Sequence, residues 1–225
     1  MRLACDSLLG LMVQAGVRSA FIALRRGKWD VPAVLGDGSQ RGLRLGYVIV
    51  DANPGVPFTV DAAFEFVRGH TVVFGYPDLL MTPPDLLARL VAAYERGGAD
   101  AVLGLLPAGD PRHMDLVDMA EGGEVRRVSA KPAAGSQPHT WVAAVWGPAF
   151  SEYLREFVKA WPEEAGVGTG REAECEMADV LNRGIGAGLR IVGEPIPEGR
   201  FVDIGRPKSL AGVLEEQSGP WWPAS

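Results

Sequence analysis

The sequence of 225 residues is poor in cysteine and histidine. It contains only Cys5, Cys175 and three scattered histidines. The two cysteines form no C-x-x-C pattern, and with so few histidines they cannot supply a Cys/His zinc site. This cysteine usage is typical of a protein in a reducing compartment, so we expect a cytoplasmic location.

Positive charge and long apolar runs are also scarce. Lysine and arginine total 22 against 28 acidic residues, giving a net charge of −6. That balance is unlike that of proteins that neutralise phosphate backbones, so nucleic acid is not expected as a partner. The segment 101–107 is among the longest apolar stretches, and it is far shorter than the ~18 residues that a membrane-spanning helix needs. We therefore expect no membrane partner.

The residues that are present predict an α/β protein. Apolar residues make up 47% of the chain, and a chain of this length can bury roughly 70% of its unfolded surface. Short apolar runs without period-2 alternation alternate with amphipathic helices, which predicts a three-layer, mainly parallel (mixed) sheet with helices on both faces. We predict one domain over residues 1–217 and a C-terminal tail over 218–225.

The expected elements follow the chain in order, with a hairpin interrupting the strand and helix units. Strands are predicted at 19–24, 43–50, 71–75, 101–106, 140–146, 189–192 and near 201–202, and the hairpin at 114–119 and 125–130. Helices are predicted around 8–13, at 59–67 with Thr59 as its cap, at 86–96, 148–161 and 174–183, and from Pro207 onward.

Two aspartates follow predicted strands. Asp78 follows the strand 71–75, and Asp203 follows the strand near 201–202. Ligands of parallel α/β sheets bind beyond the carboxyl ends of strands, and two carboxylates can share a Mg²⁺ whose other ligands are phosphate oxygens and water. Turn formation or helix capping is the alternative reading of both aspartates.

Lys131 and the pair Glu174 and Glu176 are further candidates. Lys131 ends a strand before Pro132, where its ammonium can meet a phosphate as a point charge; a solvated loop lysine is the alternative. Glu174 and Glu176 open a helix, where the backbone dipole favours negative charge, so capping explains them without a ligand. The histidines lack partners at catalytic spacing and are expected to be structural.

Taken in order, these pieces resemble the sugar-1-phosphate nucleotidylyltransferases, the glucose-1-phosphate thymidylyltransferase-like enzymes of the nucleotide-diphospho-sugar transferase (Rossmann-like) fold. The resemblance spans essentially the whole chain. It is carried by six short segments: Ala15-Gly16-Val17, Leu35-Gly36-Asp37-Gly38 with Gly42-Leu43, Asp78, Lys131-Pro132, 174–182 and Asp203-Ile204-Gly205-Arg206-Pro207.

The resemblance implies a reaction and a set of site residues. A sugar 1-phosphate would attack the α-phosphorus of a nucleoside triphosphate, giving a nucleotide sugar and pyrophosphate. Asp78 and Asp203 would hold Mg²⁺, and Lys131 would contact the phosphate of the sugar phosphate. The substrate-binding residues would be Gly55 and Thr59, in the loop whose backbone meets the base, together with Lys131, Thr140 and Glu174. A homo-oligomer is compatible with the pattern.

The sequence also departs from the family pattern. Family members begin with a strand, a G-x-G-T-R-L loop and a lysine in a P-K pair, and the first residues of this sequence match the pattern only after them. Ala130 stands where the family has glutamate, Ala144 replaces an expected glycine, and Gly75-Tyr76-Pro77-Asp78 lengthens the usual Gly-Asp. We therefore expect an N-terminally truncated form whose first strand and phosphate loop are absent.

Two other functions remain open from the sequence. The first is a non-catalytic regulatory homologue that binds a nucleotide or a nucleotide sugar. The second is a nucleotide-sugar glycosyltransferase, which ranks lower because the sequence lacks the Asp-x-Asp common in metal-dependent members of that class.

Overall fold

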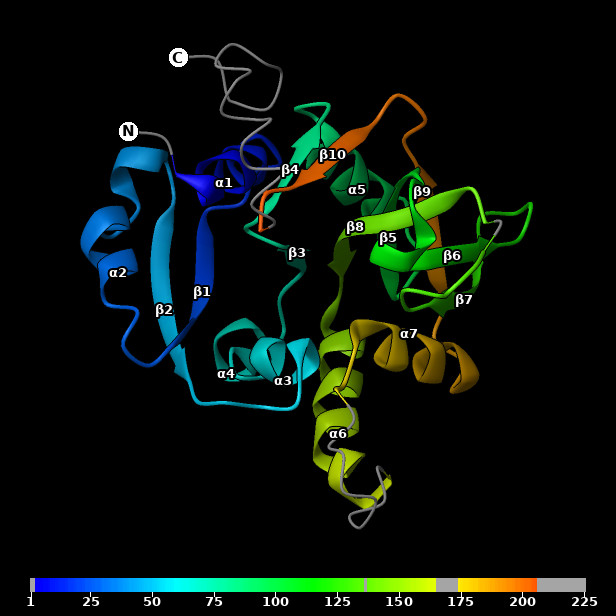
Figure 1. Cartoon of the computed structure of the whole chain (residues 1–225). Coiled ribbons are helices and arrows are strands. Elements are labelled where there is room, and N and C mark those ends of the chain that lie inside the picture. The colour runs from blue at the N-terminus through cyan, green and yellow to red at the C-terminus, as the bar shows by residue number, and fades with distance from the viewer. Residues whose placement is uncertain (1–2, 136, 165–173, 206–225) are drawn as a thin grey trace.

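The computed structural model describes residues 3–135, 137–164 and 174–205 (Figure 1). Its helices are α1 (Ala4–Gln14), α2 (Asp30–Leu35), α3 (Val56–Asp61), α4 (Phe64–Val67), α5 (Leu86–Glu95), α6 (Pro148–Glu164) and α7 (Met177–Gly186), with 3-10 turns at Ser39–Arg41 and Pro111–His113. Its strands are β1 (Ser19–Arg25), β2 (Arg44–Val50), β3 (Val72–Gly75), β4 (Leu79–Thr82), β5 (Ala101–Pro107), β6 (Leu116–Met119), β7 (Val125–Ser129), β8 (His139–Trp146), β9 (Ile191–Pro195) and β10 (Arg200–Asp203).

The strands form one large sheet and two small pairs. The large sheet has the order β7-β6-β8-β5-β9, and β3 pairs with β8 in addition. β1 and β2 form a separate parallel pair, and β4 and β10 form an antiparallel pair. The mixed sheet that the sequence predicts is confirmed. Antiparallel pairing is commoner in it than expected because β8 runs against all three of its neighbours.

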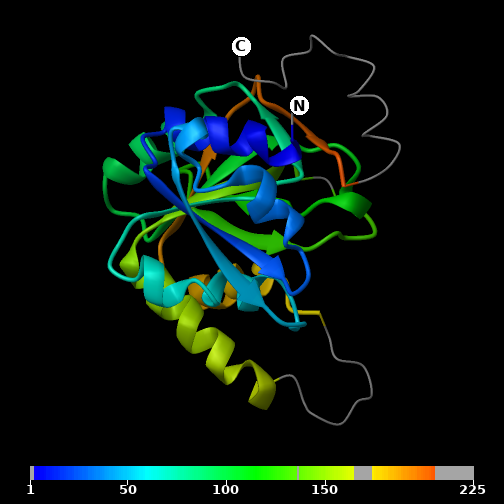
Figure 2. The ribbon, with the colours of Figure 1, turned by 90° about the vertical axis from the view of Figure 1, so that its left-hand side faces the viewer.

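Helices cover both faces of the sheets, as the sequence predicts (Figure 2). On one face, α1 and α5 bury an aliphatic cluster that includes Leu8, Leu87 and Leu90. On the other face, α6 and α7 pack Phe150 and Leu181 against the sheet. Burial of these apolar side chains is the main stabilising contribution to the arrangement.

Most elements lie where the sequence predicts them, but four details differ. Thr59 does not begin a helix: α3 starts at Val56 after Gly55, and residues 62–63 separate α3 from α4. α7 begins at Met177 rather than at Glu174, because Glu176 occupies the position before the first turn and its N–H donates to the Asp179 carboxylate. The strand β4 and the helix α2 were not expected.

Two predictions lie outside the described residues. The helix expected from Pro207 and the tail at 218–225 both fall in the segment 206–225. The division into a domain at 1–217 and a tail therefore stays a prediction.

Candidate functional site

The two candidate metal ligands lie side by side. β4 and β10 pair so that Asp203 is opposite Leu79, and the Ile204 N–H donates to the Asp78 carbonyl at 2.9 Å. A β-carbon added to Gly205 would lie 3.0 Å from Asp78 Oδ2 and 3.1 Å from Asp203 Oδ1. The pairing of β4 with β10 thus brings together two carboxylates that are far apart in the chain.

The donor set fits Mg²⁺ bound together with a phosphate. Gly205 places no side chain against the two carboxylate oxygens, and its N–H donates to Asp203 Oδ1 at 3.0 Å. Within the described ranges no group of three or more His, Cys, Asp or Glu side chains is positioned for a metal ion. Mg²⁺ commonly takes one or two carboxylates and completes its octahedron with substrate phosphates and water, so Asp78 and Asp203 suffice as its protein ligands.

Lys131 forms a short ion pair with Glu176. Its Nζ donates to Glu176 Oε1 at 2.7 Å, and this hydrogen bond raises the pKa of Lys131. The Lys131 backbone is left-handed, with φ of 37°, which is uncommon for a residue with a side chain. About half of the lysine side chain is exposed, so the ammonium is both held in place and accessible.

A half-buried carboxylate, Asp115, lies beside this pair. Its Oδ2 accepts a hydrogen bond from Trp141 Nε1 at 3.2 Å, while its Oδ1 is buried and has no partner in the described part of the chain. Burial raises the pKa of Asp115, Glu176 raises it further, and Lys131 opposes the shift. An acceptor oxygen that lacks a donor in this position has the chemistry to accept a hydrogen bond from a hydroxyl group.

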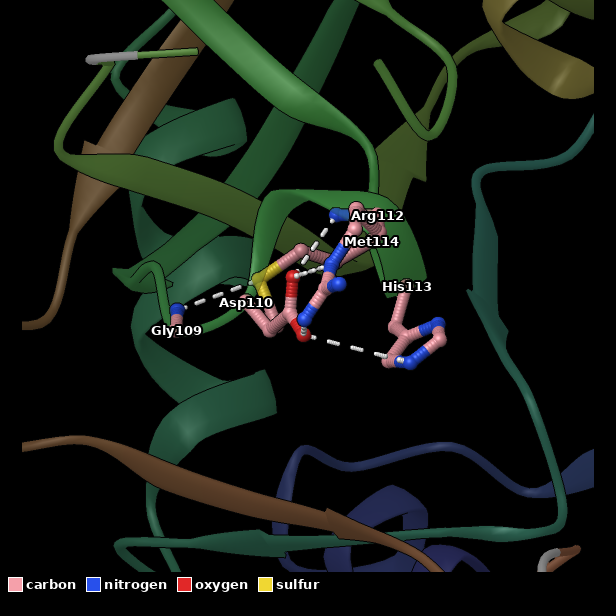
Figure 3. A network of polar contacts seen from close by, with 5 residues as sticks. All are labelled: Gly109, Asp110, Arg112, His113 and Met114. Atoms are coloured by element: carbon pink, nitrogen blue, oxygen red, sulfur yellow. Dashed lines mark hydrogen bonds and ion pairs between the residues drawn. The ribbon is translucent and has the colours of Figure 1, made fainter. Parts of the chain in front are cut away.

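The loop before Asp115 is folded on itself (Figure 3). The Arg112 guanidinium donates to both oxygens of Asp110, at 2.9 and 2.6 Å, and this contact lowers the pKa of Asp110 to about 2. The Gly109 N–H donates to Met114 Sδ at 3.1 Å. These contacts lie within the loop that leads to Asp115 and then to β6, which begins at Leu116.

Tyr76 is influenced both by Asp78, of the carboxylate pair, and by Asp115 and Glu176, which lie near Lys131. Burial raises the pKa of its phenol, and the negative charges of Asp115, Glu176 and Asp78 raise it further. Its ring packs against Phe74 and Trp141. Asp78, Asp115 and Glu176 therefore all lie within electrostatic range of one tyrosine.

The predicted base-binding loop lies against the start of α7. The Cys175 N–H donates to the Pro54 carbonyl at 2.8 Å, and a β-carbon at Gly55 would collide with the Cys175 carbonyl oxygen. The Asn53 side chain makes hydrogen bonds within this segment. Its Oδ1 accepts from the Gly55 N–H and from the Thr59 hydroxyl, and its Nδ2 donates to the Thr59 hydroxyl. The segment 53–59, which includes the start of α3, thus contacts Cys175. Cys175 is the residue before Glu176, the partner of Lys131.

The other two predicted substrate residues lie differently. Thr140 is 1% exposed within β8, between β5 and β6. Glu174 is exposed and acts on Lys131 only through its charge, whereas Glu176 makes the hydrogen bond. Tyr76 and Asp115 were not singled out as site residues from the sequence. The insertion of Tyr76 and Pro77 before Asp78 was the available signal for the tyrosine, and none pointed to Asp115.

Among the helices that the structure describes, none combines the length and the apolar character needed to cross a bilayer.

Comparisons with known proteins support the resemblance. No family model matches the chain. It is 25% identical over 215 residues to the low-salt glycan biosynthesis nucleotidyltransferase Agl11 of Haloferax volcanii; the match covers 91% of this chain and 56% of that protein. The chain thus spans about half the length of this curated relative.

Two solved structures share the fold over nearly the whole chain. A protein from Bacillus anthracis assigned as a glucose-1-phosphate thymidylyltransferase, in complex with a sucrose, has a TM-score of 0.78 at 16% identity and is matched over 96% of this chain and 83% of its own. A UDP-glucose pyrophosphorylase complexed with UDP-glucose has a TM-score of 0.74 at 15% identity, over 96% of this chain and 88% of its own. The predicted nucleotide-diphospho-sugar transferase fold is confirmed, and the chain is similar to sugar-1-phosphate nucleotidylyltransferases.

Proposed function

We propose that this chain acts as a nucleotidyltransferase that joins a nucleoside triphosphate and a sugar 1-phosphate into a nucleotide sugar, with release of pyrophosphate. The observation that carries the proposal is the placement of the Asp78 and Asp203 carboxylates against Gly205, together with Glu176, the partner of Lys131, which with Asp78 raises the pKa of Tyr76. The similarity to a glycan biosynthesis nucleotidyltransferase supports it. A role in cytoplasmic nucleotide-sugar biosynthesis is part of the proposal.

The acidic and basic residues of the site would have different roles in the reaction. A phosphate oxygen of the sugar phosphate forms a bond to the α-phosphorus of the triphosphate, and the bond from that phosphorus to the pyrophosphate oxygen breaks. Asp78 and Asp203 would hold Mg²⁺, which supplies positive charge to the phosphate oxygens when bound. Lys131 would hold the attacking sugar phosphate as a point charge, and Glu176 keeps the ammonium oriented. Catalysis then rests on positioning and charge neutralisation.

The bound sugar would lie near Asp115. Its Oδ1 is buried, makes no hydrogen bond of good geometry in the described residues, and lies close to Lys131, whose backbone N–H and charge both lower the pKa of Asp115. We assign it the role of accepting a hydrogen bond from a hydroxyl of the sugar. Gly55 and Thr59 would face the base. Glu174, which acts on Lys131 through its charge, and the buried Thr140 stay predicted substrate residues.

The test combines catalysis and binding. Pyrophosphate release is measured with a panel of nucleoside triphosphates and sugar 1-phosphates, and Mg²⁺-dependent nucleotide binding is measured by calorimetry. Asp203→Ala should abolish the Mg²⁺-dependent binding; an unchanged titration removes Asp203 from the site. Lys131→Ala should weaken sugar-phosphate binding more than triphosphate binding, with Lys159→Ala, an exposed lysine of α6, as the matched control.

A second measurement separates the enzyme from the regulatory homologue. Any ligand that binds only the folded state raises the melting temperature. Stabilisation by a triphosphate with Mg²⁺ and measurable pyrophosphate release support the enzyme. The same stabilisation without release at any substrate pair supports a non-catalytic binding protein instead.

A further inference from the structure

Helix α7 contacts the segment 125–131, which contains the edge strand β7, at two points. At the start of the helix, Glu176 Oε1 accepts the hydrogen bond from Lys131 Nζ at 2.7 Å. Six residues further along α7, the Asn182 side chain contacts the backbone of Val128. Six residues of α-helix extend over about 9 Å, so the two contacts are separate. Since the later residue of α7 meets the earlier residue of the segment, the helix runs antiparallel to β7, beside which it lies in Figure 1.

The Asn182 amide satisfies both backbone groups of one residue of β7. Its Oδ1 accepts from the Val128 N–H at 2.8 Å, and its Nδ2 donates to the Val128 carbonyl at 2.7 Å. Among the described strands β7 pairs with β6 alone, so these groups lie at the open edge of the large sheet. A side-chain amide carries a donor and an acceptor together, and Asn182 therefore binds this edge as a neighbouring strand would.

These two hydrogen bonds set the register of α7 along the strand. The Val128 side chain is 1% exposed and belongs to the apolar cluster that contains Val180 and Leu181 of α7. Apolar contact is non-directional and permits displacement along the strand, whereas paired hydrogen bonds of 2.7 and 2.8 Å hold one position. The amide therefore determines the register, and the apolar packing around it does not.

The register in turn decides whether Glu176 reaches Lys131. Lys131 lies three residues after Val128 in the chain. Glu176 is fixed at the start of α7, because its N–H donates to Asp179 Oδ2 at 2.9 Å. A displacement of one strand residue is about 3.3 Å, which would break the 2.7 Å hydrogen bond between Glu176 and Lys131. The position of the ammonium thus depends on the contact that lies further along the helix.

We propose that Asn182 is a positioning residue for Lys131: its amide sets the register of α7 on β7 and so keeps the Glu176 carboxylate against the ammonium. Asn182 acts through the backbone of β7 and through the helix, and it is not a catalytic residue. The placement of Lys131 does not depend on the proposed function. That the ammonium placed in this way binds a sugar phosphate does rest on it.

Competitive acetylation of the full chain tests the placement of Lys131. The protein is treated with a trace of acetic anhydride at pH 8, and mass spectrometry gives the ratio of acetylation at Lys131 to that at Lys159, an exposed lysine of α6 in the same molecule. Only the neutral amine reacts. The Glu176 hydrogen bond raises the pKa of Lys131 most, the charges of Asp115 and Glu174 raise it further, and burial opposes them. Losing the Glu176 contact should therefore increase the ratio.

Two variants of neighbouring residues on α7 separate positioning from a general loosening of the helix. Asn182→Ala should increase the acetylation ratio at least about three-fold. Arg183→Ala removes a guanidinium that lies over the rings of Phe157 and Trp161 of α6, and it should leave the ratio unchanged. An equal rise in both variants, or no rise in a folded Asn182→Ala, would overturn the proposal.

A double variant tests the route of the effect. Glu176→Gln removes the carboxylate and should increase the ratio by itself, so adding Asn182→Ala to it should have no further effect. Additive effects would overturn the proposal, because Asn182 would then act on Lys131 by another route. Asn182→Asp keeps the acceptor for the Val128 N–H and loses the donor to its carbonyl. It should also increase the ratio, and it replaces Asn182→Ala in these tests if that variant does not fold.

Calorimetry tests the consequence for ligand binding. Asn182→Ala should weaken the binding of glucose 1-phosphate about ten-fold and leave Mg²⁺-dependent triphosphate binding unchanged. If the unaltered chain binds glucose 1-phosphate and Asn182→Ala binds it equally well, the positioning role is overturned. If the unaltered chain binds neither glucose 1-phosphate nor any other member of the sugar 1-phosphate panel, the proposed function is contradicted, and the acetylation ratios still decide the role of Asn182.

Discussion

β5 and β1 have similar apolar sequences but very different surroundings. Six of the seven residues of β5 are buried, whereas only one of the seven in β1 is buried. β5 lies between β8 and β9 and beneath α5, while β1 pairs with β2 alone in the described residues. The comparison teaches that the burial of an apolar strand depends on its neighbours in space, and that composition alone does not determine it.

The largest expected effect comes from truncating one side chain in each strand. Leu103 of β5 is fully buried, so Leu103→Ala should lower the free energy of unfolding by about 3 kcal/mol. Phe21 of β1 is 39% exposed, so Phe21→Ala should cost less than about 1 kcal/mol. Urea unfolding of both variants measures the difference, and equal losses would contradict the comparison.

A second variant tests the ion pair between α3, which lies between β2 and β3 in the chain, and α6, which packs against the large sheet. Arg155 of α6 donates to Asp61 Oδ2 of α3 at 2.6 Å, and the other oxygen of Asp61 is buried without a partner in the described residues. Arg155→Ala would leave this carboxylate buried and unpaired, at an expected cost of about 2 kcal/mol. Adding Asp61→Asn should restore part of the loss. If the double variant is no more stable than Arg155→Ala, the carboxylate charge is not the cause.

The next largest effect is expected at Asp115, whose contribution to the free energy of unfolding depends on pH. Burial raises its pKa, so the folded state binds this proton more tightly than the unfolded state does. Its contribution to stability is therefore greatest below the ordinary aspartate pKa of about 4, and it declines as pH rises from there through the raised pKa. Asp115→Asn should flatten this decline and stabilise the protein by up to about 1 kcal/mol at pH 7. Thermal unfolding from pH 4 to 7 measures it, with Asp118→Asn, in the strand β6 that follows Asp115, as control. A decline that is unchanged in Asp115→Asn would contradict the assignment.

The smallest effect is expected at the ion pair that joins α1 to the 3-10 turn before β2. Arg41 Nε donates to Asp6 Oδ1 at 2.8 Å, and both side chains are partly exposed. Solvent screens such a pair, so Arg41→Ala should cost less than about 1 kcal/mol and less again in high salt. The difference rests on Asp61, whose second oxygen is buried without a partner in the described residues, so a loss as large as that of Arg155→Ala would contradict it.

The elements that the sequence predicts well are those with a strong local pattern. The helix of α5 and the hairpin of β6 and β7 follow from apolar spacing and from the turn residues between the strands. β4 was missed because Leu79–Thr82 is short and directly follows Pro77 and Asp78, a sequence typical of a turn. It becomes a strand by pairing with β10, a long-range contact that a local pattern does not reveal.

The candidate site was predictable in part for the same reason. Asp78, Asp203 and Lys131 were singled out because each lies at the end of a predicted strand within a recognisable short segment, and the fold brings Asp78 and Asp203 side by side. Asp115 has no such signal: its importance comes from Trp141 and Lys131, which are close to it only in the folded chain. Choosing Glu176 over Glu174 as the partner of Lys131 likewise needed the exact start of α7.

The pairing of β4 with β10 has a consequence for how the protein is made. Asp78 belongs to the first half of the chain, and Asp203 lies on the last described strand. A ribosome adds roughly 5–20 residues per second and domains tend to form as their segments emerge, so β4 waits several seconds for the strand that it pairs with. The two carboxylates therefore come together only after residue 203 has been translated, and by then all the described strands of the large sheet have been made. A nascent chain arrested before residue 200 would carry most of the described core and lack the pairing of Asp78 with Asp203.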